Sequence, residues 1–260
     1  MIPLKDQELI RQKFAQELAG PVKIDFFTER QLAIAVPGRK PCAYCKPTRE
    51  MLQELSGLSD LISLRVHILD DNTEEKRKFG IERVPATVLR GHDSAFFKYY
   101  GLPGGTEFPA FIESIVDISR NETLLSDDSV KELRKLKADV TVRVFVTPTC
   151  PYCPQMARAA YQLALTNPRV KAEVIEVNEF PELADRYGVR AVPLTVINDT
   201  TAIPGAVHES VLVEQVLKAA GSAVAEPTPP SGPTTATAAP REPQQPIKHG
   251  QQRDSGLFIP

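Results

Sequence analysis

The chain has no tryptophan, only four cysteines among 260 residues, and no apolar run long enough to span a bilayer. Residues 1–16 carry charges throughout and lack the apolar core of a signal peptide. Lys and Arg number 31 against 33 Asp and Glu, for a net charge of −2, and no basic cluster is present. These absences predict a cytoplasmic protein that has neither a nucleic-acid nor a membrane partner.

The four cysteines all lie in two CxxC motifs, CAYC at 42–45 and CPYC at 150–153, so none remains for structural disulfides. The second motif follows an alternating strand pattern at 140–147 and precedes a helical pattern at 155–165. A strand, a CxxC and a helix in this order are typical of thioredoxin-like redox sites. The cysteines are therefore expected to do chemistry.

The first cysteine of each motif is the predicted nucleophile. A thiol needs help to lose its proton, and the unpaired N–H groups at a helix N-terminus favour the thiolate. We therefore assign attack on a disulfide to Cys150 and Cys42, and resolution of the mixed disulfide to Cys153 and Cys45. CxxC spacing alone is also used by zinc sites, so the surrounding residues decide between the two interpretations.

A proline stands 43 residues after the first cysteine in both halves, in Val84-Pro85 and Val192-Pro193. In thioredoxin-like folds such a proline is cis and lies beside the disulfide, and the preceding residue pairs with an extended substrate. The alternative is an ordinary edge-strand proline. We expect both dipeptides to bind substrate, together with Tyr44 and Tyr152 between the cysteines.

The cysteine and proline positions repeat at an offset of 108 residues, which indicates an internal repeat of a whole domain. We predict an α/β protein of two tandem thioredoxin-like folds, each a three-layer α/β/α unit with a central mixed sheet. The predicted domains are 1–121, with an insertion within 29–41, and 122–221. The Pro-rich segment 222–260 cannot bury a core and is expected to be a disordered tail.

Periodicity places elements in each half in the same order. Helices are expected at 9–18, 48–57, 74–80, 107–120, 129–138, 155–165, 181–187 and 209–220, and strands at 22–28, 61–69, 86–90, 96–100, 140–147, 171–177 and 194–198. Gly101 and Gly205 precede the last helix of each half, where a tight turn or a close backbone favours glycine.

Two carboxyl groups are candidate proton relays. Asp25 lies in Ile-Asp-Phe-Phe, and by alignment of the halves it falls where the repeat has Val144. A buried carboxyl there would act as a general base, whereas the alternative is an Asp that faces solvent. Glu176 is the candidate in the second half, which lacks an Asp25 equivalent. In the 11-residue insertion, Arg39 and Lys40 are candidates for favouring the Cys42 thiolate, unless the loop has no such role.

The segments 146–154 and 100–108 resemble the two-domain protein disulfide oxidoreductases, also described as glutaredoxin-like proteins, and the similarity runs from the first helix to about Gly221. The resemblance implies dithiol–disulfide exchange with disulfide-containing protein substrates, as reductase and also as oxidase or isomerase. It also implies recharging by a thioredoxin-reductase-like flavoprotein. No cofactor and no metal are expected.

Several alternatives stay open at this point. The Pro-Tyr pair of the second motif is glutaredoxin-like, so glutathione is an alternative substrate. A dedicated electron donor to one peroxidase is a further alternative, because the chain resembles the tandem module that precedes flavoprotein peroxide reductases, although that family keeps one CxxC and this chain has two. A zinc-binding structural protein with one four-thiolate site, or a chaperone-like module with incidental thiols, would belong to other classes.

Overall fold

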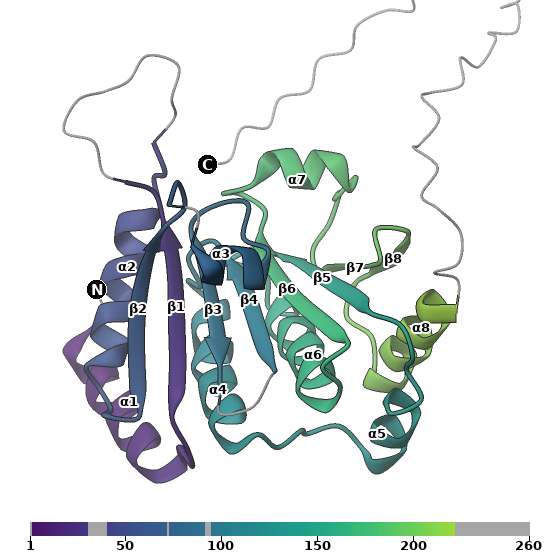
Figure 1. The fold of residues 1–260 in the computed structure, drawn as a ribbon, viewed down its shortest axis with the longest axis horizontal. Helices are drawn as coiled ribbons and strands as arrows, with labels where there is room; N and C mark the ends of the chain where they lie inside the picture. The colour runs from purple at the N-terminus through teal and green to yellow at the C-terminus, as the bar shows by residue number, and fades with distance from the viewer. Residues whose placement is uncertain (1, 31–40, 72, 92–94, 222–260) are drawn as a thin grey trace, which may run out of the picture. The chain divides into compact units, whose positions relative to one another are not determined.

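The computed structural model describes residues 2–30, 41–71, 73–91 and 95–221, all within the compact unit Met1–Ala225 (Figure 1). The predicted insertion falls mostly on 31–40 and the predicted tail on 222–260, so both lie outside the described residues. The elements, in chain order, are α1 (Leu4–Glu17), β1 (Val22–Thr28), α2 (Cys45–Ser56), β2 (Ile62–Ile68), α3 (Glu74–Phe79), β3 (Ala86–Arg90), β4 (Phe96–Tyr100), α4 (Glu107–Arg120), α5 (Asp127–Leu133), β5 (Val140–Val146), α6 (Cys153–Thr166), β6 (Val170–Glu176), α7 (Pro181–Arg186), β7 (Leu194–Ile197), β8 (Thr201–Pro204) and α8 (Glu209–Gly221).

Eight strands form one mixed sheet in the order β2-β1-β3-β4-β6-β5-β7-β8. In the first half β1 pairs parallel with β2 and antiparallel with β3, and in the second half β5 pairs in the same way with β6 and β7. The halves are joined because β4 pairs parallel with β6. The predicted α/β class is confirmed, and the repeat appears as two four-stranded halves of a single sheet.

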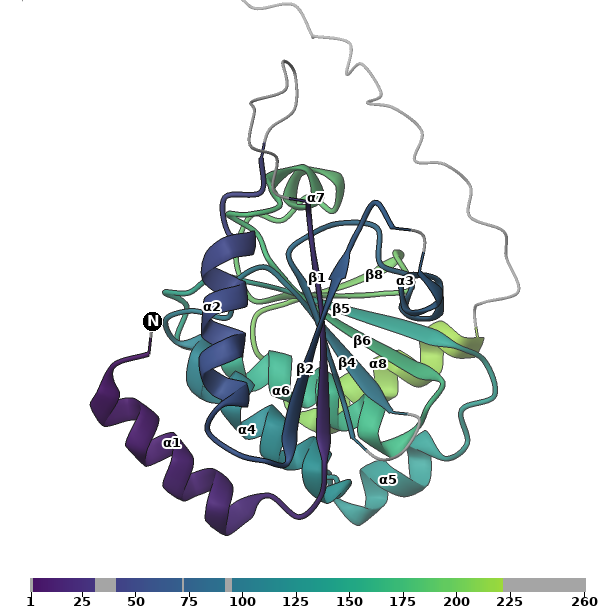
Figure 2. The same cartoon turned by 60° about the vertical axis from the view of Figure 1, so that its left-hand side comes forward.

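Helices cover both faces of this sheet (Figures 1 and 2). The helices α2, α4, α6 and α8 pack on one face, and α3 and α7 pack on the other. Because side chains alternate along a strand, Ile24 and Phe26 of β1 join the core under α2 and α4, whereas Phe27 joins the core under α3. The first core continues into the second half through Val142 and Met156, so the halves share buried apolar side chains.

The pairing register corrects the predicted alignment of the two halves. Phe27 pairs with Ala86 and Phe145 pairs with Leu194, so Phe27 corresponds to Phe145. Asp25 therefore corresponds to Arg143, and the predicted match to Val144 is wrong by one residue. The error arose because the prediction aligned Thr28 with Thr147, although β5 ends at Val146 and the turn before CPYC is longer by one residue. The insertion in the first half is therefore ten residues long.

The sequence patterns located most elements but missed β8 (Thr201–Pro204), which pairs antiparallel with β7. This strand is short, ends in proline and follows a turn with positive φ at Asn198 and Asp199. Among the described residues no helix is long and apolar enough to cross a membrane.

Candidate active site

The second CxxC motif lies where β5 ends and α6 begins. Cys150 and Cys153 form a disulfide, with Cα atoms 5.5 Å apart. Cys153 is the first residue of α6 and is fully buried, whereas Cys150 precedes the helix and is 7% exposed. The Cys153 N–H donates to the Sγ atom of Cys150 at 3.2 Å. A helix N-terminal donor therefore reaches the sulfur of the predicted nucleophile, as the thiolate argument requires.

Both predicted prolines are in the cis form, in Val84-Pro85 and Val192-Pro193. At the second site the Sγ atom of Cys150 lies 3.7 Å from the carbonyl oxygen of Val192, so the proline segment borders the disulfide. The glycine predictions are confirmed. Gly101 and Gly205 have φ of 107° and 75°, and their N–H groups donate to the carbonyl oxygens of the two cis prolines at 3.0 and 2.8 Å.

The first CxxC motif forms the matching disulfide, Cys42 to Cys45, with Cα atoms 5.4 Å apart. Cys45 begins α2 and is buried, and Cys42 is half-buried. The Cys42 N–H donates to the carboxylate of Glu29 at 2.6 Å, a contact that the sequence patterns did not predict. Tyr44 and Tyr152, at the tips of the two motifs, are 42% and 64% exposed, so both rings stand open to solvent beside a disulfide.

A loop from the first half holds the second motif in place. The Thr106 hydroxyl donates to the carbonyl oxygen of Cys150 at 2.8 Å and also lies 3.2 Å from that of Pro148, to which the Thr106 N–H donates at 2.8 Å. Gly105 has φ of 56°, and a Cβ atom there would stand 2.1 Å from the Pro148 oxygen. The second site is thus built from both halves of the chain, which the repeat alone did not indicate.

Three carboxyl groups lie beside this loop: Glu107 and Glu176 are buried, and Glu179 is half-buried. Burial raises the pKa of Glu107 to about 7, and one of its oxygens has no hydrogen-bond partner. Burial also raises the pKa of Glu179 to about 7. The hydrogen bond from the Leu102 N–H opposes this rise, and the charge of Glu176 adds to it. Glu107 was not predicted, because an acid in the first turn of a helix is common.

Glu176, the predicted relay residue of the second half, is 2% exposed and lies at the end of β6. Burial raises its pKa, although hydrogen bonds from Asn178 and from the Glu179 N–H lower it. By strand alternation with Val174 it points to the face that carries α6.

Asp25 is fully buried, so the alternative of an Asp that faces solvent is wrong. Its two oxygens are held by His67 Nε2 at 2.9 Å and Arg90 Nε at 2.6 Å. The His67 ring stacks on Phe27, which places this cluster on the α3 face, opposite α2 and Cys45. The contacts of Asp25 therefore indicate a buried ion-pair cluster and give no support for a relay to the cysteines.

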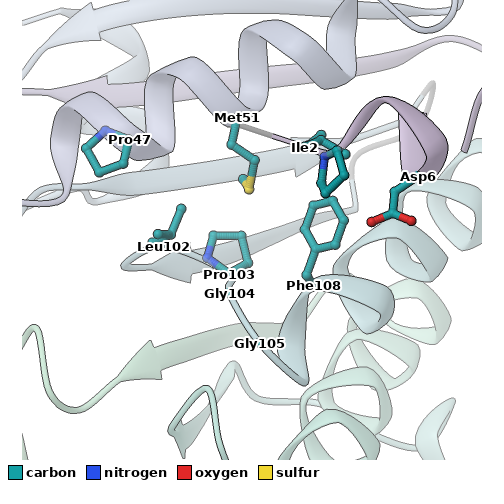
Figure 3. A pocket seen from close by; sticks show the side chains of 10 residues that line it. Ile2, Asp6, Pro47, Met51, Leu102, Pro103, Gly104, Gly105 and Phe108 are labelled. Carbon is teal, nitrogen blue, oxygen red and sulfur yellow. The ribbon is translucent and has the colours of Figure 1, made fainter. Parts of the chain in front are cut away.

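An apolar cavity of about 270 Å³ lies between α2, the start of α1 and the loop that supports the second site (Figure 3). Met51, Phe108 and Pro103 point into it, and Pro47, two residues after Cys45, lies at its edge. Gly105, which packs against Pro148, also lines it. The cavity thus borders segments that carry both CxxC motifs.

Over the described part of the chain, no three or more His, Cys, Asp or Glu side chains are grouped so that they could hold a metal ion. A four-thiolate zinc site needs the four cysteines to converge at one point. The four cysteines instead form two disulfides, one at the start of α2 and the other at the start of α6.

Parts of the chain match known redox proteins in sequence. A thioredoxin domain profile matches residues 140–218. A thioredoxin from Methanocaldococcus jannaschii is 39% identical over 80 residues, which are 30% of this chain and 94% of that protein. The F subunit of alkyl hydroperoxide reductase from Xanthomonas campestris pv. phaseoli is 27% identical over 149 residues, which are 57% of this chain and 26% of the relative. The chain thus spans about a quarter of the alkyl hydroperoxide reductase relatives that it matches.

Solved structures that match most of the chain include two further redox proteins. A protein disulfide oxidoreductase from Aeropyrum pernix K1 is 27% identical, with a TM-score of 0.73 over 84% of this chain and 94% of that one. An N-terminal domain of the alkyl hydroperoxide reductase AhpF from Enterococcus faecalis is 22% identical, with a TM-score of 0.72 over 83% of this chain and 100% of that one. The second match supports the fold alone.

Proposed function

The chain belongs to the thioredoxin family, and we propose that it exchanges disulfides with protein substrates through both CxxC pairs. The solved structures confirm the tandem thioredoxin-like fold predicted from the sequence. The predicted thiol–disulfide oxidoreductase class is supported by the similar thioredoxin and protein disulfide oxidoreductase. The observation that carries the finer proposal is the second site, where a helix N-terminal N–H reaches the Cys150 sulfur and a cis proline segment borders it.

The proposed reaction begins with attack of the Cys150 thiolate on a substrate disulfide. A Cys150–substrate bond forms, and one substrate sulfur leaves as a thiolate. The Cys153 thiol then loses its proton and attacks the Cys150 sulfur, which releases the second substrate thiolate. The substrate gains two electrons, and the chain ends with the Cys150–Cys153 disulfide. Cys42 and Cys45 perform the same steps in the first half.

The Cys153 proton needs a buried acceptor, because Cys153 has no exposed surface. We propose Glu107 and Glu176 for this role, since both carboxyl groups are buried beside the second site and have raised pKa values. Substrate backbone is proposed to pair with Val192-Pro193 and Val84-Pro85, and Tyr152 and Tyr44 offer exposed rings for contact.

Each catalytic cycle requires an external redox partner, because the cysteines end as disulfides. A thioredoxin-reductase-like flavoprotein is the proposed electron donor. The similarity to the F subunit of alkyl hydroperoxide reductase favours a second candidate, in which the chain passes electrons to a peroxidase. Two CxxC pairs in place of one favour the general protein oxidoreductase.

Reduction of insulin disulfides tests the proposal. Wild type, Cys42→Ser/Cys45→Ser and Cys150→Ser/Cys153→Ser are each supplied with dithiothreitol, and precipitation of the insulin B chain is followed. We expect wild type to reduce insulin and the second double variant to lose most of the rate. Absence of activity in all three proteins would refute the proposal, and a parallel assay with a glutathione mixed disulfide separates glutaredoxin activity from it.

A further inference from the structure

The two CxxC motifs are attached to their strands in different ways. At the second site, the Cys150 N–H donates to the backbone oxygen of Thr147 at 3.2 Å, within the short turn after β5. At the first site, the insertion separates Cys42 from the end of β1, and the Cys42 N–H donates to the Glu29 side chain at 2.6 Å. A carboxylate oxygen therefore replaces the backbone oxygen as the acceptor.

Glu29 is well placed to act as the acceptor for the Cys42 N–H. It directly follows Thr28, the last residue of β1, so its side chain starts at the C-terminal end of a strand that is paired on both sides. Its carboxylate accepts directly from the Cys42 N–H, and a hydrogen bond to a charged acceptor is stronger than one to a neutral acceptor. The first motif thereby keeps a fixed position at the start of α2 although the short turn is missing.

The replacement also changes the charge beside the first motif. The acceptor at the second site is a neutral carbonyl group, whereas the acceptor at the first site carries a negative charge. A negative charge near a cysteine opposes formation of a thiolate, and only the thiolate attacks disulfides.

We propose that Glu29 is a positioning residue that anchors Cys42 and makes the first site a slower nucleophile than the second. The inference rests on the proposed function for its consequence, a division of labour in which Cys150 attacks first. Its test does not use substrate turnover, so loss of this inference and loss of the proposed function are distinguishable.

Anchoring is measured by hydrogen exchange of the Cys42 amide in the oxidised protein. Glu29→Gln keeps an acceptor oxygen and is expected to stay within a few-fold of wild type, whereas Glu29→Ala is expected to exchange roughly tenfold faster or more. Glu50→Gln, which removes one charge from the exposed side of α2, is the matched control and should match wild type. Equal exchange in Glu29→Ala and wild type would overturn the anchoring role.

The effect of the Glu29 charge on Cys42 is measured as the rate at which iodoacetamide alkylates Cys42 in a Cys45→Ser/Cys150→Ser/Cys153→Ser background. Glu29→Gln is expected to speed alkylation near neutral pH about threefold, because a larger thiolate fraction is partly offset by lower nucleophilicity. Glu50→Gln should leave the rate unchanged, and Glu29→Gln should leave Cys150 unchanged in the reciprocal background. An unchanged Cys42 rate in Glu29→Gln would overturn the charge effect.

Discussion

Glu107 lies in an environment that disfavours its charged form. The residue is 1% exposed, one carboxyl oxygen lacks a hydrogen-bond partner, and burial raises its pKa from 4.5 to about 7. The folded chain therefore binds the Glu107 proton at pH values where the unfolded chain has lost it. Stability from this group is full below about pH 4.5 and declines as pH rises toward 7.

We therefore predict that Glu107→Gln flattens the pH dependence of the unfolding free energy between pH 5 and 7.5. In wild type this group should cost up to about 3 kcal/mol of stability over that range, and the neutral amide has no proton to lose. Urea unfolding at several pH values measures it, with the exposed Glu182→Gln as control. An identical slope in wild type and Glu107→Gln would show that this carboxyl does not titrate there.

The same substitution should slow the second site. If Glu107 accepts the Cys153 proton, Glu107→Gln in a Cys42→Ser/Cys45→Ser background should lower insulin reduction at neutral pH by roughly tenfold to a hundredfold. The initial attack by Cys150, measured by alkylation, should change little. If the rates of insulin reduction and of Cys150 alkylation fell equally, the substitution would have damaged the site, and Glu107 would not be the proton acceptor.

The spacing of cysteines and prolines predicted much of the site, because both kinds of residue repeat at the same offset along the chain. The cysteines and the cis prolines could be found in this way, since their chemistry needs fixed positions. Thr106 could not, because it contacts a motif of the other half and is 44 residues from Cys150 in the chain. Glu107 could not either, because its burial depends on packing between distant segments. Asp25 matched a local pattern, yet its neighbours Arg90 and His67, which decide its role, come from other strands.

The loop from Gly101 to Thr106 connects the two sites. It begins with the Gly101 N–H on the oxygen of cis Pro85 and ends with the Thr106 hydroxyl on the oxygen of Cys150. The pattern of apolar residues correctly predicted the strand before this loop and the helix after it. Its contacts were unpredictable because they depend on how β4 pairs with β6, which no local pattern encodes.

Adjacent glycines in this loop allow a matched test. Gly105→Ala should lower the unfolding free energy by about 2 kcal/mol or more, since its Cβ atom would meet the Pro148 oxygen at 2.1 Å and φ is positive. Gly104→Ala should be tolerated, because its nearest contact would be 3.9 Å. Chemical unfolding gives both values, and alkylation of Cys150 reports the second site. Similar effects of the two variants would argue against a tight contact at Gly105.

Buried and half-buried polar contacts cross between the halves. Lys98 of β4 lies 2.5 Å from Glu173 of β6, and Arg158 of α6 pairs with Asp117 of α4 at 2.8 Å. Burial opposes the charge of Glu173, but Lys98 and Arg143 hold its pKa below the usual value. Stability from this carboxylate is therefore present above about pH 4.5 and is lost as pH falls below it. These contacts and the shared core favour unfolding of both halves together.

We predict a single unfolding transition, and Lys98→Met should lower its free energy by about 3 kcal/mol, because removal of one partner leaves a buried charge poorly paired. Hydrogen exchange of β1 and β5 in denaturant follows each half separately. Loss of protection in one half at a lower denaturant concentration than in the other would contradict a joint unit.

The most direct test of the proposed mechanism is to trap the substrate on Cys150. The Cys42→Ser/Cys45→Ser/Cys153→Ser variant retains the nucleophile and lacks the resolving thiol, so a protein disulfide substrate should stay attached. Mass spectrometry of the non-reduced digest is predicted to show the substrate cysteine joined to Cys150, and the matching Cys150→Ser variant with Cys153 restored should trap far less. Equal trapping in the two variants, or none in either, would contradict attack by Cys150.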